Sequence, residues 1–312
     1  MGKILITGGG GFVGQNLIDF LLKETGYEVI SIQRKPSTTH EKLKIIYHDL
    51  RSPISEKTSS EIGEVDYIIH LAASTCAKKS IDNPMNFVMD NIVGTVNLLE
   101  YARHNVKNLK QFLYFSTAEV FGSAPDGTIF KESDFPNPSS PYAATKISAQ
   151  EFCISYKNAF GVPVVIAYAM NAFGPYQSLE KFIPLMIEKI LKEKKIFIYS
   201  NGEGTAPHRR NYLHVEDLCG AILFLTECGI SGEKYNIAAE EESDNLKLAQ
   251  MISKILGKKL NYELVRQRQN SLTHPCLSGE KLQKLGWQQK KTLEEGLIEL
   301  IKWTKREKIY DY

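Results

Sequence analysis

One pair of side chains in the middle of the chain could exchange a proton with a bound hydroxyl, and a second pair lies at the end of a predicted strand. Tyr142 and Lys146 lie four residues apart in a segment with helical spacing, so they share one face of the helix. Free tyrosine, with a pKa of about 10, is a poor base at neutral pH, but a neighbouring ammonium group favours the phenolate. Thr117 and Glu119 directly follow an apolar run of strand length. Because a Tyr–Lys pair at this spacing often occurs by chance, its meaning depends on the elements around it.

A glycine-rich turn near the start of the chain supplies that context. Gly8, Gly11 and Gly14 follow a short apolar run, and helical spacing begins at Phe12 and Val13. Strand, glycine turn and helix in this order predict a dinucleotide site, although the spacing G-x-x-G-x-x-G is shifted from the usual G-x-G-x-x-G. We expect Gly8 to turn the chain, Gly11 to admit a pyrophosphate and Gly14 to let the helix approach the sheet. The N–H groups at the start of the helix would bind the phosphates.

The end of the second predicted strand, residues 28–33, bears on the choice of dinucleotide. An NAD site usually has an Asp or Glu here, which accepts hydrogen bonds from the ribose hydroxyls. This strand ends in Gln33, which could still bond a hydroxyl, followed by Arg34 and Lys35, which could bind a 2′-phosphate or form a solvated basic turn. NAD and NADP therefore both remain open.

Further strand ends carry residues that suit the same site. A third strand is predicted over 44–47, and Asp49 after it could accept from an adenine amino group or lie in a surface turn. A nearly continuous apolar strand over 65–73 ends in small residues that would let a cofactor approach. Within it, His70 is predicted to be a core histidine rather than a catalyst.

The order of the predicted elements defines the fold class. Strands alternate with helices over residues 1–170, which predicts an α/β, Rossmann-type, doubly wound parallel sheet that binds the dinucleotide. Residues 171–312 lose this strict alternation and predict a smaller, mixed α/β lobe over the carboxyl edge of the sheet, with the chain free to cross between the two. One long helix is predicted over 83–104, a polar loop over 201–210 and a helix over 214–228.

Composition narrows the function classes. The chain has 312 residues, 43% of them hydrophobic and 24% charged, as in ordinary globular proteins. A net charge of +2 gives no large field of one sign, which argues against nucleic-acid and membrane-surface partners. The five cysteines are scattered without C-x-x-C pairs, so we expect neither a disulfide framework nor a metal site. With no membrane-length apolar run and no signal peptide before the first strand, a cytoplasmic protein is expected.

Together these motifs resemble the extended short-chain dehydrogenase/reductase family. Within it the sequence looks most like nucleotide-sugar 4,6-dehydratases of the dTDP-glucose type, with UDP-glucuronate decarboxylases and sugar 4-epimerases as relatives. The likeness extends from residue 3 to about residue 287. The segments that carry it are 7–14, 70–73, 91–95, 116–122, 141–146, 171–176, 180–184 and 210–217.

The resemblance implies an NAD- or NADP-dependent enzyme that acts on a nucleoside-diphosphate sugar. Thr117, Tyr142 and Lys146 would oxidise the C4 hydroxyl by hydride transfer to the nicotinamide. The C4 ketone acidifies the C5 proton, which Glu119 could remove before the C6 hydroxyl leaves and the hydride returns at C6. A homodimer through helices 83–104 and 142–160 is also implied. The implied substrate contacts are Asn171, Lys181, Arg210 and Asn236. The expected cofactor contacts are Gly8, Gly11, Phe12, Val13, Gln33, Arg34, Asp49, Leu50, Leu71, Ala72, Ala73, Asn91, Tyr142 and Lys146.

Three departures from the dTDP-glucose type affect the later steps. Ala118 stands where that type has the Asp that protonates the departing oxygen. Residues 74–78, Ser-Thr-Cys-Ala-Lys, replace Glu-Ser-His-Val-Asp in the segment that shapes the sugar pocket. An arginine expected near His274 is absent, and Arg209 or Arg266 could replace it. A 4-dehydrogenase, 4-ketoreductase or 4-epimerase without elimination is therefore the alternative, and a catalytically silent dinucleotide sensor is a third.

Overall fold

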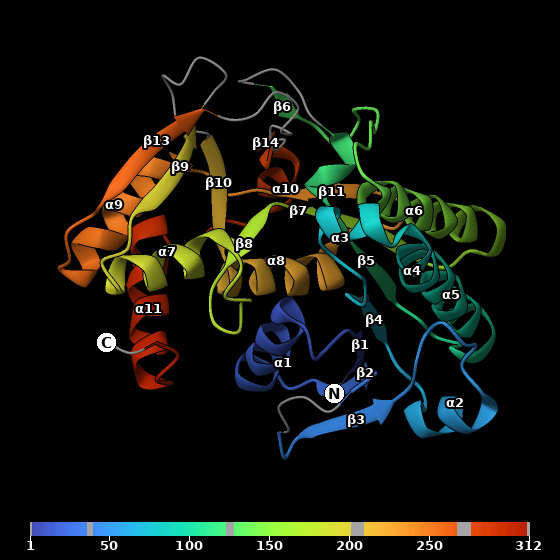
Figure 1. Ribbon diagram of the computed structural model, residues 1–312. Helices are drawn as coiled ribbons and strands as arrows, with labels where there is room; N and C mark the ends of the chain where they lie inside the picture. Colours follow the sequence, from blue (N-terminus) through green and yellow to red (C-terminus); the bar gives the residue numbers. More distant parts are fainter. Residues whose placement is uncertain (1, 36–39, 123–127, 201–208, 267–275, 311–312) are drawn as a thin grey trace.

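The computed structural model describes residues 2–35, 40–122, 128–200, 209–266 and 276–310, apart from the side chain of Arg209. Its centre is a seven-stranded sheet with the order β11-β7-β5-β4-β1-β2-β3, in which every pair is parallel (Figure 1). The predicted doubly wound parallel sheet is thereby confirmed. Its strands are β1 (Lys3–Thr7), β2 (Glu28–Gln33), β3 (Leu43–Tyr47), β4 (Tyr67–His70), β5 (Gln111–Thr117), β7 (Val164–Ala169) and β11 (Lys234–Ile237).

Helices cover both faces of this sheet because its strands are apolar on both sides. The pleat divides β1 between two cores: Leu5 joins the cluster on one face, whereas Ile4 and Ile6 join the cluster on the other. The Leu5 face is covered by α2 (Glu56–Ile62), α5 (Gly94–Asn105) and α6 (Pro141–Phe160). The opposite face is covered by α1 (Phe12–Glu24) and α8 (Val215–Cys228), which also contact each other.

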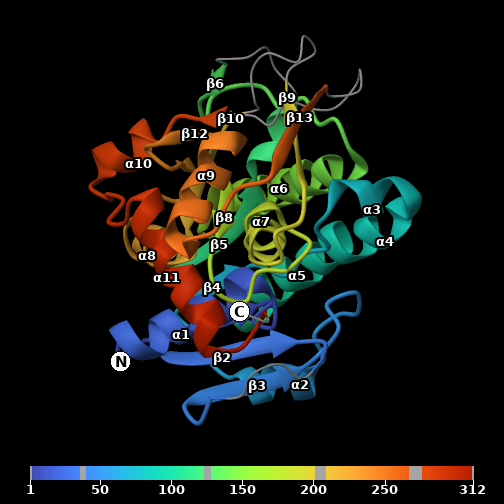
Figure 2. The same ribbon diagram turned by 60° about the vertical axis from the view of Figure 1, so that its left-hand side comes forward.

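A second lobe with its own apolar core lies beyond one end of the strands (Figures 1 and 2). One of its sheets has the order β12-β10-β8, with β8 (Asn171–Phe173), β10 (Arg209–His214) and β12 (Glu242–Asp244). The other pairs β9 (Ile196–Ser200) with β13 (Tyr262–Arg266). Its helices are α7 (Phe182–Leu191), α9 (Asn245–Leu256) and α11 (Leu293–Arg306). A parallel pair of β6 (Ile129–Phe130) and β14 (Cys276–Leu277), followed by α10 (Glu280–Leu285), joins distant parts of the chain.

The structure corrects several predicted elements. The apolar run 65–73 forms a strand only as far as His70. The helix predicted over 83–104 is α4 (Pro84–Phe87), a π-helical turn η1 (Val88–Val93) and α5, preceded by α3 (Ala77–Asp82). Of the loop predicted over 201–210, residues 201–208 lie outside the described residues, and Arg209 and Arg210 begin β10. That polar strand exists because its backbone pairs with β8 and β12, which local hydrophobicity does not indicate.

Residue 170 is not a strict boundary between the two halves of the chain. After β8 and β10, the chain returns to the central sheet as α8 and β11, and β11 pairs with β7. Within the described residues, no helix combines the length and the hydrophobicity needed to cross a membrane.

Candidate active site

The glycine turn between β1 and α1 is packed so closely that larger residues would not fit. Gly8 has a φ of 78°, and a Cβ on Gly14 would lie 2.2 Å from the carbonyl oxygen of Gly8. A Cβ on Gly9 would lie 2.1 Å from Ser31 Oγ on β2. Gly11 is the N-cap of α1 and contributes no side-chain cap. This cradle at the N-terminus of a helix fits a pyrophosphate. Sequence reasoning gave Gly9 no role, although its place in the glycine run was a signal.

The loop after β4 lies directly against this turn. The Ala72 N–H donates to Thr7 Oγ1 at 3.3 Å, and a Cβ on Gly8 would lie 2.7 Å from the Ala72 nitrogen. Leu71, Ala72 and Ala73 are all partly exposed, so they border the region where the resemblance places the cofactor. His70 is a buried core histidine, as predicted. Its ring nitrogens lie 2.7 Å from Thr7 Oγ1 and 2.9 Å from Thr95 Oγ1. Burial lowers the pKa of His70 to about 3.

Helix α6 positions the predicted Tyr–Lys pair. The Ser140 side chain caps the helix by accepting from the Ala143 N–H, and the helix begins at Pro141. Tyr142 and Lys146 are both buried, and the Tyr142 phenol is hydrogen-bonded to Thr117. Lys146 Nζ donates to the carbonyl oxygen of Phe115 at 2.7 Å. The pair is thus held against the carboxyl end of β5, where Thr117 was predicted to meet it.

The electrostatics of the pair differ from the sequence prediction. Burial raises the pKa of Tyr142, the nearby Glu119 carboxylate raises it further, and the Thr117 hydrogen bond opposes both. Burial also lowers the pKa of Lys146 to about 7. The prediction that the ammonium lowers the pKa of Tyr142 is therefore wrong for the protein alone: burial is the largest cause of the shift, and the groups that act on the phenol are Glu119 and Thr117. Tyr142 is a neutral phenol here.

Glu119 joins this pair to the predicted substrate residues. It lies in the 3₁₀ turn η2 (Ala118–Phe121), and its N–H donates to Thr117 Oγ1 at 3.3 Å. Burial raises the pKa of the Glu119 carboxyl, whereas the positive charges of Lys181 and Arg210 lower it. The preceding Ala118 is 6% exposed and packs in the apolar core.

Two of the four predicted substrate residues, Asn171 and Arg210, lie on the neighbouring strands β8 and β10. Asn171 pairs across the strands with Tyr212, two residues beyond Arg210. Within the described structure, the Nε of Arg210 is buried without a hydrogen-bond partner, as expected of a donor that awaits an acceptor. Lys181 is exposed at the N-cap of α7.

Asn236, the fourth predicted substrate residue, lies inside the central sheet, and among the described residues its side-chain oxygen has no hydrogen-bond partner. It is fully buried in β11, and its side-chain amide donates to the carbonyl oxygens of Phe130 at 3.1 Å and Ser278 at 3.0 Å. No part of Asn236 is exposed to a ligand. It ties the β6–β14 pair to the central sheet, and this structural use was not visible in the sequence because all three segments are distant along the chain.

Some of the remaining predicted cofactor residues are exposed and could contact the cofactor, whereas others are buried and hold neighbouring segments in place. Asn91 is buried in η1, where its amide donates to Ser74 O at 3.1 Å and Thr145 Oγ1 at 2.9 Å and its oxygen accepts from the Ser74 N–H at 2.7 Å. Asn91 therefore positions the loop after β4, with its hydrogen-bonding atoms already engaged. Leu50 packs in the core, and exposed Asp49 accepts from the Arg51 N–H. Phe12 and Val13 are partly exposed in the first turn of α1. Gln33 and Arg34 lie at the end of β2, as predicted.

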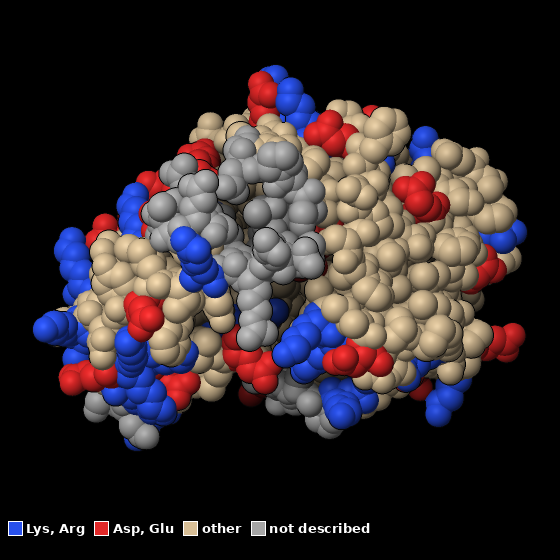
Figure 3. Space-filling view, turned by 45° about the horizontal axis from the view of Figure 1, so that its top comes forward, with Lys and Arg blue, Asp and Glu red and all other residues tan. Residues whose placement is uncertain are grey.

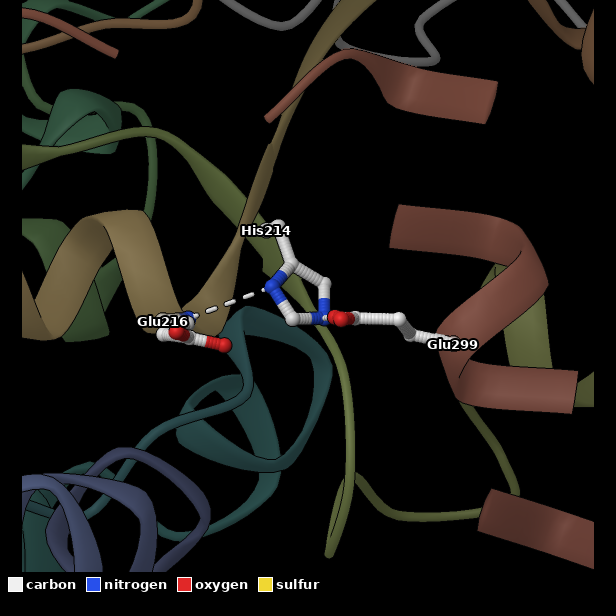
Figure 4. Close-up of side chains that lie close together, drawn as sticks. All are labelled: His214, Glu216 and Glu299. Atoms are coloured by element: carbon white, nitrogen blue, oxygen red, sulfur yellow. Dashed lines mark hydrogen bonds and ion pairs between the residues drawn. The ribbon is translucent and has the colours of Figure 1, made fainter. Parts of the chain in front are cut away.

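A separate cluster lies where β10 passes into α8, and Figure 4 shows its three ligand-like side chains. His214 Nδ1 accepts from the Glu216 N–H, and its Nε2 lies 3.8 Å from a carboxylate oxygen of Glu299 on α11. Lys291 Nζ bonds to both glutamates. The ammonium group already supplies the positive charge between these carboxylates, so the cluster is an ion-pair junction between the two lobes.

Fold and site together define an enzyme of the extended short-chain dehydrogenase/reductase type. The sequence profile of the NAD dependent epimerase/dehydratase family matches residues 4–238, and the chain belongs to this family. It is 32% identical to the dTDP-glucose 4,6-dehydratase of Haemophilus influenzae over 97% of this chain and 98% of that protein. It is 30% identical to a probable dTDP-glucose 4,6-dehydratase of Sinorhizobium fredii over 96% and 92% of the two chains.

Solved structures show the same likeness. The dTDP-glucose 4,6-dehydratase of Bacillus anthracis in complex with NAD superposes with a TM-score of 0.86 and 29% identity, over 99% of this chain and 98% of that one. The UDP-N-acetylglucosamine 4-epimerase of Methanobrevibacter ruminantium gives a TM-score of 0.87 at 26% identity, over 98% and 99% of the chains. The predicted family, fold and NAD(P)-dependent enzyme class are thus confirmed.

Proposed function

We propose that the protein is a nucleoside-diphosphate-hexose 4,6-dehydratase that binds its dinucleotide at the glycine turn. The observation that carries this proposal is the position of Glu119. Its carboxylate acts electrostatically on Tyr142 and is itself acted on by Lys181 and Arg210. The Glu119 carboxylate thus interacts with Tyr142, which exchanges the proton, and with the two cationic side chains that are suited to binding a diphosphate.

The residues divide the chemistry among them. A dinucleotide held at the glycine turn would supply the hydride acceptor for the sugar C4 and the hydride donor for C6. Tyr142 first loses its phenolic proton to solvent. Its phenolate oxygen then takes the proton of the C4 hydroxyl, with Thr117 hydrogen-bonded beside it and Lys146, in its ammonium form, stabilising the phenolate. Glu119, whose raised pKa makes it a stronger base, removes the C5 proton after C4 becomes a ketone. The C6–O bond then breaks, and water leaves.

Ala118 favours a second candidate, C4 redox without elimination. Its methyl group cannot protonate the departing C6 oxygen, and it is buried in the core. The proton must then come from Glu119 after it has taken the C5 proton, or from water. A 4-epimerase, 4-ketoreductase or 4-dehydrogenase needs no such donor.

The test incubates purified protein with dTDP-, UDP-, CDP- and GDP-hexoses and follows product mass together with nicotinamide absorbance. We expect a product lighter by one water and no net reduction of the cofactor, with Glu119→Gln lowering that rate by about 10² or more. Glu180→Gln, which removes an exposed carboxylate beside Lys181, is the control. Unchanged mass with altered sugar stereochemistry would establish the second candidate, as would accumulating reduced cofactor with loss of two hydrogens.

We also propose a homodimer through the helices predicted for it, α4 with α5 and α6, together with the adjoining α3. The side of the molecule where these helices lie has few charged side chains in the view of Figure 3. Ile81, Met85, Phe152 and Phe160 are exposed apolar side chains on these helices. Light scattering should give the mass of two chains at micromolar concentration. Phe152→Asp should give one, whereas Phe135→Asp, in the exposed loop before α6, should not; a monomeric wild type would refute the dimer.

Two broader predictions remain proposals. We propose that the dinucleotide-binding unit comprises the central sheet with its helices, and that residues from 171 onward mainly form the nucleotide-sugar lobe. A cytoplasmic location is supported by the five cysteines, all of which are free thiols. Fractionation of the source cells would test the location.

A further inference from the structure

A serine on a neighbouring helix holds the backbone of Tyr142 from outside α6. The first N–H groups of a helix find no partner within the helix itself. At the start of α6, Pro141 has no N–H, and the Ser140 hydroxyl accepts from the Ala143 N–H. The N–H between them, that of Tyr142, donates to Ser80 Oγ on α3 at 3.0 Å. The backbone of Tyr142 is therefore fixed by a segment about 60 positions away in the chain.

The Ser80 hydroxyl is oriented for this contact. Ser80 is 0% exposed, and its hydroxyl donates to the carbonyl oxygen of Ala77 at 2.6 Å. A serine hydroxyl has one proton and two lone pairs, so donation to Ala77 leaves Ser80 to accept from Tyr142. If the hydroxyl were removed, the Tyr142 N–H would become a buried donor without its acceptor, which is an unfavourable state. The start of α6 would then have to shift to find another partner.

Further contacts hold the rest of Tyr142 in place. Its carbonyl oxygen accepts from Thr145 Oγ1 at 2.8 Å, and Thr145 in turn accepts from Asn91 in η1. The Phe87 ring on α4 meets the Tyr142 ring edge-on, with the ring centroids 6.2 Å apart. The phenol itself is hydrogen-bonded to Thr117. Because the ring and the backbone are fixed together, a shift of the Tyr142 backbone would also move the phenol relative to Thr117.

We propose, on the basis of the function proposed above, that Ser80 is a positioning residue for proton transfer at Tyr142. Ser80 fixes the start of α6 so that the phenol stays beside Thr117, where the C4 hydroxyl must approach. A misplacement of about 1 Å in a reacting geometry can cost about 10²-fold in rate. Helix α3 begins within residues 74–78, where the sequence departs from the dTDP-glucose type. Ser80 therefore also connects that segment to Tyr142.

Steady-state kinetics of Ser80→Ala test the proposal, with whichever of the dTDP-, UDP-, CDP- and GDP-hexoses the wild type converts fastest. We expect kcat to fall at least about tenfold, while KM and dinucleotide affinity change less than about threefold. Ser80→Cys keeps the size and a weaker acceptor, so its kcat should fall about threefold or more but less than that of Ser80→Ala. Ser148→Ala is the matched control on α6. Ser148 Oγ donates to the carbonyl oxygen of Ala144 in the same helix at 2.8 Å, so its loss should leave kcat within about twofold of wild type.

A double-mutant cycle separates positioning of the phenol from a general effect on the fold. If Ser80 acts through the Tyr142 phenol, Ser80→Ala should slow the Tyr142→Phe enzyme by less than about twofold, because the group that it positions is gone. Effects that multiply in the double variant would overturn the positioning role, as would a kcat within about twofold of wild type in Ser80→Ala or Ser80→Cys. Undiminished turnover in Tyr142→Phe, or no turnover of any of the four hexoses by wild type, would instead refute the proposed function and this role with it.

Discussion

Replacing Gly14 by alanine tests whether α1 meets β1 as closely as the glycine turn indicates. The new Cβ would lie 2.2 Å from the Gly8 carbonyl oxygen and 2.7 Å from the Gly9 Cα. Both are backbone atoms, so no side-chain rotation can relieve the overlap. Gly8 has a φ of 78°, which restricts how the turn can move. Either α1 must lift from the sheet or the turn must open.

The expected magnitude is the sum of two opposing terms. Alanine is favoured over glycine inside a helix by about 1 kcal/mol. Overpacking a close contact costs roughly 1–3 kcal/mol and occasionally more. We therefore expect a net loss of up to about 2 kcal/mol in the free energy of unfolding, which lowers the melting temperature by up to roughly 6 °C in a domain of this size. Because the turn forms the cradle, dinucleotide affinity should also fall, by about tenfold or more.

Gly220→Ala is the matched control. Gly220 lies in α8, and the nearest atom to its added Cβ would be Trp287 Nε1 at 4.0 Å. With open space and the same gain in helix propensity, this variant should melt slightly above wild type and bind dinucleotide normally. Thermal unfolding followed by circular dichroism, with calorimetry for binding, measures both. If Gly14→Ala were as stable as Gly220→Ala and bound dinucleotide normally, the close helix–sheet contact would be refuted.

Three other predictions follow from the buried ionisable groups. Tyr142→Phe should keep its melting temperature within a few degrees but lose about 10²–10⁴ in turnover, and turnover within threefold of wild type would exclude Tyr142 as the proton carrier. The pKa of Lys146 falls from 10.5 to about 7 on folding, so the unfolded chain binds more protons between these values and stability should rise with pH across them. Lys146→Met should show a smaller rise in chemical-denaturation midpoint from pH 7 to 10, and an equal rise would contradict the lowered pKa. The pKa of His70 falls from 6.5 to about 3 on folding, so the contribution of this histidine to stability is lost as pH falls below 6.5. The His70→Gln variant should therefore lose less stability than wild type between pH 6.5 and 4. An equally steep loss in both proteins would show that another group causes the acid sensitivity.

The sequence by itself determined the fold class and the positions of most central elements. β2 has the bounds predicted from its apolar run, and α8 ends at the predicted residue 228 and begins one residue later than predicted. These succeed because hydrophobic periodicity is a local record of which face of a strand or helix is buried. The glycine run before Phe12 also predicted its structure correctly, since a tight turn next to a closely packed helix leaves no room for larger side chains. The spacing of Tyr142 and Lys146 placed them on one helix face for the same local reason.

Only the tertiary structure decided which distant residues meet and what burial does to their charges. Asp90 meets Arg34 and Arg51 across 56 and 39 positions, and no local pattern records such a pairing. Asn236 has the residue type of a ligand contact, but its side-chain amide donates to Phe130 in β6 and to Ser278 just after β14. The direction of the Tyr142 pKa also reversed, because desolvation depends on everything packed around a group and not on its neighbour four residues along the helix.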